Sequence, residues 1–177
     1  MNEKDILHQF DTARLGRFHL ALVLLSGLCW ALVAYGVTII GFLLPSLREE
    51  WQVSSSALGL LAGSGLLGMF LGSTAGGHLA DRIGRRATLI WSLIFSGIFF
   101  VASAAAWNYG SLLTFRLLMG TGLGAIIPII STMITEFSPS KTRGMLSVII
   151  NLCWGIGGTL AAFVGYKVVI DHGWRLA

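Results

Sequence analysis

Arg116 is a basic residue inside a long apolar stretch, residues 111–135. An ionisable side chain at such a position is costly and usually marks a ligand pathway or a buried partner. A guanidinium suits a carboxylate, which it holds through two parallel hydrogen bonds. We therefore interpret Arg116 as a candidate group for binding an anionic substrate. The alternative is that its long side chain extends along the helix to the water interface.

A second group of charges lies between two apolar stretches, in the segment 77–86. This segment reads Gly77-His78-Leu79-Ala80-Asp81-Arg82-Ile83-Gly84-Arg85-Arg86. A membrane topology signal explains the arginines, but not the acid, nor the glycines at both ends, which suit a tight turn. Glu136 and Arg143 flank a later break and could form a second charge pair, although a surface pair alone contributes little.

Other polar groups carry weaker signals. Tyr35 and Asn151 lie in apolar stretches and could line a cavity, although hydrogen bonds between helices explain them equally well. Cys29 and Cys153 have no Cys-x-x-Cys or Cys/His spacing and suit small packing residues. No nucleophile, metal cluster or paired carboxylate occurs in or near the apolar stretches. We therefore expect no enzyme, no metal site and no cofactor.

The composition is that of a membrane protein. Of the 177 residues, 55% are hydrophobic and 11% are charged, against about 25% charged in a soluble domain. The few basic residues form short clusters, which argues against nucleic-acid binding. A spanning helix needs about 20 apolar residues. We predict an all-α integral membrane fold, with a cytoplasmic head at 1–18 and a helix bundle at 19–177. The first helix is expected at about 20–44, ending at Pro45. The others are expected at about 54–77, 87–106, 111–135 and 144–168, with a truncated sixth helix after Trp174 and Arg175.

Two independent signals set the predicted orientation. Basic residues predominate on one side, which the positive-inside rule assigns to the cytoplasm together with the N-terminus. They are Lys4, Arg14, Arg17, Arg82, Arg85, Arg86, Lys141 and Arg143, against Arg48, Lys167 and Arg175 on the other side. Interfacial aromatic residues mark the opposite helix ends. They are Trp51, Trp107, Tyr109 and Trp174.

Glycines at helical spacing predict where helices pack closely. Small residues let helix backbones approach each other in lipid, where no hydrophobic force drives association. The predicted packing positions are Gly68, Gly72 and Gly76 in the second stretch, Gly120 and Gly124 in the fourth, and Gly158 in the fifth. The same surfaces could instead slide during a transport cycle.

These motifs resemble those of the major facilitator superfamily. The segment 77–86 is similar to its loop signature, G-x-x-x-D-R-x-G-R-R. Arg116 with Gly120 and Gly124 resembles the helix 4 signature of this family. The loop between its helices 4 and 5 resembles the segment Glu136-x-x-Pro139-x-x-x-Arg143-Gly144. The segments 41–47, 122–128 and 172–175 look most like the aromatic acid:proton and related metabolite:proton symporters. Those symporters carry D-G-x-D in helix 1, where this chain has Val33-Ala34-Tyr35-Gly36.

The resemblance implies the N-terminal half of a secondary active transporter in a bacterial-type inner membrane. It implies transport of a small organic anion, such as an aromatic carboxylate, by alternating access with proton or ion coupling. Arg116, Tyr35 and Asn151 would line the substrate or proton pathway. Asp81 would contact a helix N-terminus in the other half as part of a cytoplasmic gate with Gly77, Arg82, Gly84, Arg85, Arg86, Glu136 and Arg143.

Two alternatives stay open from the sequence. The first is a truncated remnant or partner subunit that does not transport, because the chain stops at Ala177 and lacks the helix 1 acids. The second is a transporter of sugars or other metabolites. Besides substrate and bilayer, the expected partner is the missing C-terminal half or a second chain.

Overall fold

The computed structural model describes residues 16–176, apart from the side chains of 170–172 and 176. Residues 1–15 of the predicted head lie outside this range. The described chain forms five long helices, all apolar enough to cross a membrane, and contains no strand. This confirms the all-helical membrane class. The helices are α2 (Arg17–Trp51), α3 (Ser55–Ile83), α4 (Arg85–Ala104), α5 (Tyr109–Phe137) and α6 (Ser140–His172), followed by a 3-10 turn, η1 (Trp174–Leu176).

The first helix does not end at Pro45, contrary to our expectation. α2 continues through this proline to Trp51, and Gln52 ends it in the left-handed region with φ 53°. The Gln52 N–H donates to the Arg48 carbonyl at 3.0 Å. Proline removes one backbone hydrogen bond but is tolerated in membrane helices, where other groups satisfy the freed carbonyl. The charged residues 48–50 thus form the last turn of the helix rather than a loop.

The second correction concerns the segment 77–86, which is not a loop. α3 continues to Ile83, and α4 begins at Arg85, so that Gly84 is the single residue between them. Gly84 has φ 91° and makes the turn, whereas Gly77 lies in the helix with open space beside it. Helix formation satisfies the backbone groups of this segment within the helix, and one glycine is enough to reverse the chain.

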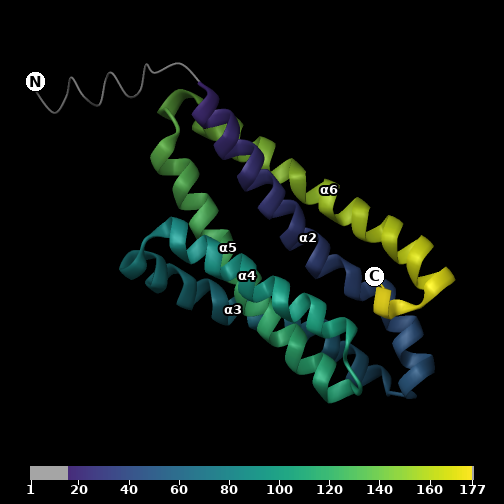
Figure 1. Ribbon diagram of the computed structural model, residues 1–177. Coiled ribbons are helices and arrows are strands. Elements are labelled where there is room, and N and C mark those ends of the chain that lie inside the picture. The colour runs from purple at the N-terminus through teal and green to yellow at the C-terminus, as the bar shows by residue number, and fades with distance from the viewer. Residues whose placement is uncertain (1–15, 177) are drawn as a thin grey trace, which may run out of the picture.

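The helices form two groups. α3, α4 and α5 pack together, and α2 and α6 pack along each other's length, while α2 makes few contacts with α3 or α5. Figure 1 shows the α2–α6 pair beside the other three helices, with η1 returning against α2.

Glycines allow the closest contacts within each group. A Cβ at Gly68 or Gly72 would overlap the α5 backbone, and one at Gly120 or Gly124 would overlap the α3 backbone. In α6 the predicted position is wrong by one residue. A Cβ at Gly157 would overlap the backbone of Ala31, whereas one at Gly158 would have no atom closer than 3.9 Å. One residue rotates a helix position by about 100°, so adjacent glycines point to different neighbours.

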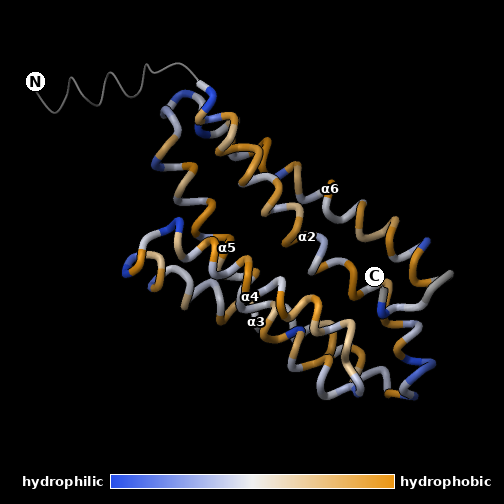
Figure 2. The backbone as a smooth tube through the Cα atoms, in the orientation of Figure 1, coloured by the Kyte–Doolittle hydropathy of each residue, from blue (hydrophilic) through white to orange (hydrophobic). Residues whose placement is uncertain are grey.

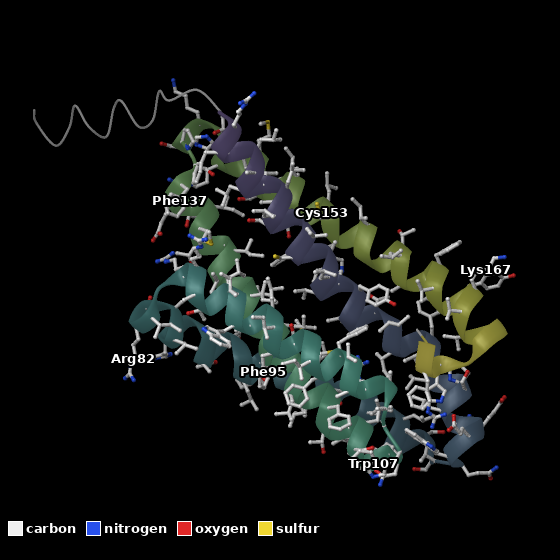
Figure 3. The ribbon with its side chains drawn as sticks, in the orientation of Figure 1. Arg82, Phe95, Trp107, Phe137, Cys153 and Lys167 are labelled. Carbon is white, nitrogen blue, oxygen red and sulfur yellow. The ribbon has the colours of Figure 1, made fainter. Side chains whose placement is uncertain are left out.

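Aromatic and charged contacts mark the two ends of the bundle. Phe18 packs against Phe137 at one end, where Arg85 also meets Glu136, and Trp51 packs against Trp174 at the other. Figure 2 shows polar segments at the helix ends and apolar ones between them. Figure 3 places Arg82 and Phe137 near one end and Trp107 and Lys167 near the opposite one. We call these the Asp81 end and the Glu50 end.

Candidate functional site

Arg116 lies about 10 Å along α5 from its start at Tyr109, at 1.5 Å per residue. It is only 4% exposed, so its side chain does not extend to the water interface. Its Nη2 donates a hydrogen bond of 3.0 Å to the Gly36 carbonyl of α2. Its Nε is buried and has no hydrogen-bond partner among the described residues. The guanidinium is therefore oriented by one neutral acceptor and has a donor to spare.

No carboxylate accompanies this buried charge in the part of the chain that the structure describes. The ion pairs found there are Arg85–Glu136 and Arg175–Glu50, and neither includes Arg116. Val33, at the first of the two positions where the resembling symporters have Asp, is fully buried in an apolar cluster. A buried charge with a neutral partner keeps much of its desolvation cost, which an anion bound beside it would reduce.

A cavity of about 210 Å³ opens beside Arg116 between α2, α4, α5 and η1. Its wall is mainly apolar, with Phe100 and Trp174 as aromatic members and Arg175 as a second guanidinium. The remaining lining residues are Ile39, Leu43, Val101, Ser103, Ala104, Leu112 and Met119. Pockets for drug-sized ligands span about 300–1,000 Å³, so this volume suits a smaller, single-ring molecule.

The other two predicted pathway residues do not share this position. Tyr35 does not line the cavity but contacts Phe100, which does, at a tilt and with ring centroids 5.8 Å apart. Asn151 is exposed on α6 and donates through Nδ2 to the Ser147 carbonyl of the same helix at 2.8 Å. The structure thus places Tyr35 near the Arg116 cavity and Asn151 outside it.

The predicted gate residues gather at the Asp81 end. Arg85 forms a 2.7 Å ion pair with Glu136 that links the start of α4 to the end of α5. Glu136 does not pair with Arg143, contrary to our expectation. Arg143 instead donates to the Ser138 carbonyl at 3.4 Å. The reason is the short turn at Gly84, which starts α4 with Arg85 in place beside the last turn of α5.

Asp81, Gly84, Arg85 and Arg86 line a second cavity, of about 920 Å³, at this end. Its other walls come from the start of α2, the first turns of α4 and the end of α5, including Phe18 and Phe137. Asp81 and Arg82 are exposed. The acid is therefore accessible to a group from outside the described residues.

One cluster at the Glu50 end was not predicted. Glu50 accepts hydrogen bonds from the indole N–H of Trp174 and from Arg175, whose Nη2 lies 2.8 Å from Oε1. The guanidinium carbon of Arg175 lies 4.5 Å from the centroid of the Trp174 ring. The only available signal was the expected position of Trp51, the neighbour of Glu50, and of Trp174 at the same membrane face.

A sequence model of the Major Facilitator Superfamily matches residues 26–177. The chain belongs to the Major Facilitator Superfamily. Family membership supports a transporter rather than an enzyme, in agreement with the prediction from the sequence.

Named relatives of this superfamily member are considerably longer. The niacin transporter NiaP of Acinetobacter baylyi is 34% identical over 173 residues, which are 98% of this chain and 39% of NiaP. The 4-hydroxybenzoate transporter PcaK of Pseudomonas putida is 33% identical, over 97% of this chain and 38% of PcaK. Synaptic vesicle glycoprotein 2A of Rattus norvegicus is 38% identical, over 98% of this chain and 24% of its own length.

A solved structure shows the same fold. The inward-open xylose transporter XylE from E. coli superposes with a TM-score of 0.79 at 24% identity, over 89% of this chain and 43% of XylE. The chain therefore spans less than half the length of each of these proteins.

Proposed function

We propose that this chain is the N-terminal part of a secondary active transporter for a small organic anion, such as an aromatic carboxylate. The observation that carries this proposal is the buried guanidinium of Arg116, which lines a cavity and has no carboxylate partner in the described chain. A substrate carboxylate would supply the missing negative charge.

The surroundings of Arg116 favour an aromatic carboxylate as the ligand. The hydrogen bond to Gly36 holds the Nη2 end of the guanidinium, and Nε has no hydrogen-bond partner among the described residues, so a carboxylate would supply an acceptor that the protein does not. The rings of Phe100 and Trp174 and the aliphatic wall offer an apolar surface to an aromatic ring. A sugar would require many more hydrogen-bond partners than this wall contains.

The printed names of two relatives agree with this substrate class. Niacin and 4-hydroxybenzoate each combine one aromatic ring with one carboxylate. The name of the third relative states no substrate.

We further propose alternating access with Asp81 in a cytoplasmic gate. The exposed Asp81 carboxylate would contact the N-terminus of a helix outside the described chain, where the helix dipole favours a negative charge. The Arg85–Glu136 pair would hold the α3–α4 turn in position for this contact. Breaking the contact would let the two halves of the transporter rock apart.

Transport by this scheme requires further helices and a coupling group. The relatives are more than twice as long as the matched region, so we propose that a continuing chain or a second chain completes the site. Proton or ion coupling is proposed from family membership. It would have to use groups other than positions 33 and 36, which are Val and Gly here.

Uptake measurements on the protein expressed from its full native gene test the proposal. We expect saturable uptake of labelled niacin or 4-hydroxybenzoate, and none of the neutral amide of niacin. Arg116→Gln should raise the half-saturating concentration at least about tenfold, because a hydrogen-bonded charge is lost, and Arg116→Lys should raise it less. The exposed Arg48→Gln serves as control. Equal uptake of the acid and the amide, or no uptake of either acid, would exclude this function.

A further inference from the structure

The cavity beside Arg116 has a second guanidinium at its rim. Arg175 lines the same 210 Å³ cavity, but its side chain is 48% exposed, whereas Arg116 is 4% exposed. A solute that arrives from the Glu50 end therefore meets Arg175 first and Arg116 only deeper in the protein.

The rim already holds a carboxylate that belongs to the protein itself. One oxygen of Glu50 accepts from Nη2 of Arg175 at 2.8 Å, and the other accepts from the indole N–H of Trp174. The Arg175 guanidinium also lies over the Trp174 ring. Trp174 and Arg175 together, called the rim site below, thus offer one donor to each oxygen of a single carboxylate.

Glu50 can be displaced from the rim site at little cost. Its side chain is 36% exposed, and an exposed ion pair contributes little to stability. Trp174 itself is 5% exposed and packs in the apolar cluster of α2, α3, α5 and α6, so the donor indole stays in place when Glu50 leaves. A second carboxylate can therefore replace Glu50 without rebuilding the site.

We propose that the rim site is a first binding site for the carboxylate of the substrate, which displaces Glu50 there before it reaches Arg116. This inference rests on the function proposed above. The ligand class is an aromatic carboxylate, whose ring has Trp174 and Phe100 available on the cavity wall. Glu50 acts as a competing carboxylate that keeps the rim site closed when no substrate is present.

Two substitutions that break the same ion pair distinguish binding from structural support. Arg175→Gln removes the cation, so we expect the half-saturating concentration of niacin to rise about fivefold. Glu50→Gln removes the competing charge and leaves Arg175 free, so we expect that concentration to fall about threefold. Arg48→Gln, an exposed arginine in the last turn of α2, should change neither. The measurements are niacin uptake and equilibrium binding by the full native protein in membrane vesicles.

The sign of each change decides the outcome. A purely structural clamp would make both variants worse, because either one removes the same contact, and this result would overturn the rim site. Unchanged affinity in Arg175→Gln, with uptake that still depends on Arg116, would overturn the rim site and leave the proposed function intact. Absence of saturable niacin and 4-hydroxybenzoate binding by the unaltered protein would overturn both.

Discussion

Gly72 offers the most direct test of how the α3 and α5 helices pack. A Cβ built at this glycine would overlap the carbonyl and the Cα of Thr121 in α5. These are backbone atoms, so no change of side-chain rotamer can relieve the overlap, and the two helices would have to move apart. Gly72→Ala should therefore destabilise the bundle although alanine is the better helix former.

The expected size of this effect follows from the cost of overpacking. Inserting one carbon into a close-packed contact costs about 1–3 kcal/mol, and sometimes more. Because the neighbouring atoms belong to a rigid backbone, we expect Gly72→Ala to lower the free energy of unfolding by about 3 kcal/mol. At roughly 2–4 °C per kcal/mol for a chain of this size, the midpoint of thermal unfolding should fall by about 6–12 °C.

The matched control is Gly97→Ala in α4. A Cβ at Gly97 would meet nothing within 4 Å, so this variant should be neutral or slightly stabilising. The assay is the thermal stability of both purified variants in the same detergent. If Gly72→Ala unfolds within about 2 °C of the unaltered protein, the close α3–α5 contact is not as the structure has it, and the argument fails.

Two other predictions concern the Asp81 end. Asp81→Asn should lower the maximal uptake rate about fivefold, equivalent to ~1 kcal/mol of lost interaction with a helix N-terminus. Substrate binding should be retained. An unchanged uptake rate would contradict the gate. Gly84→Ala should destabilise the bundle by about 1–3 kcal/mol, because φ 91° with ψ 149° is a conformation for glycine. Gly77→Ala, in open helical surroundings, is its control, and equal melting midpoints for the two variants would show that the turn tolerates a side chain.

The number and type of the membrane helices could be predicted from the sequence, because both depend on the composition and length of the apolar stretches. Each membrane-length apolar stretch became one helix, and a charged or polar break separated it from the next. The ends of these helices did not follow, because the apolar stretch marks the part in lipid while hydrogen bonding continues beyond it. Pro45 illustrates the limit, since the cost of a proline depends on its neighbours in the fold.

The candidate site could be predicted only in part. Arg116 was identifiable because a charge within an apolar stretch needs an explanation. Its acceptor, the Gly36 carbonyl, was not, because a backbone group carries no sequence signal and lies 80 residues away along the chain. The partner of Glu136 was assigned to a cation nearby in the sequence, Arg143, whereas the fold brings Arg85 into the ion pair.

The positions of Arg116 and Arg175 suggest how substrate binding could act on the two helix groups. The Arg116–Gly36 hydrogen bond joins α5 to α2, and the Glu50 contacts hold η1 against α2 while η1 also touches α4. The Arg116–Gly36 hydrogen bond and the contact of η1 with α4 cross between the two helix groups, which otherwise meet sparsely. A ligand can shift a conformational equilibrium only by binding one arrangement better than another. A carboxylate that replaces Glu50 at Arg175 would release the contact between α2 and η1, so the same charge that is recognised would also alter how α2 is held against the rest of the bundle.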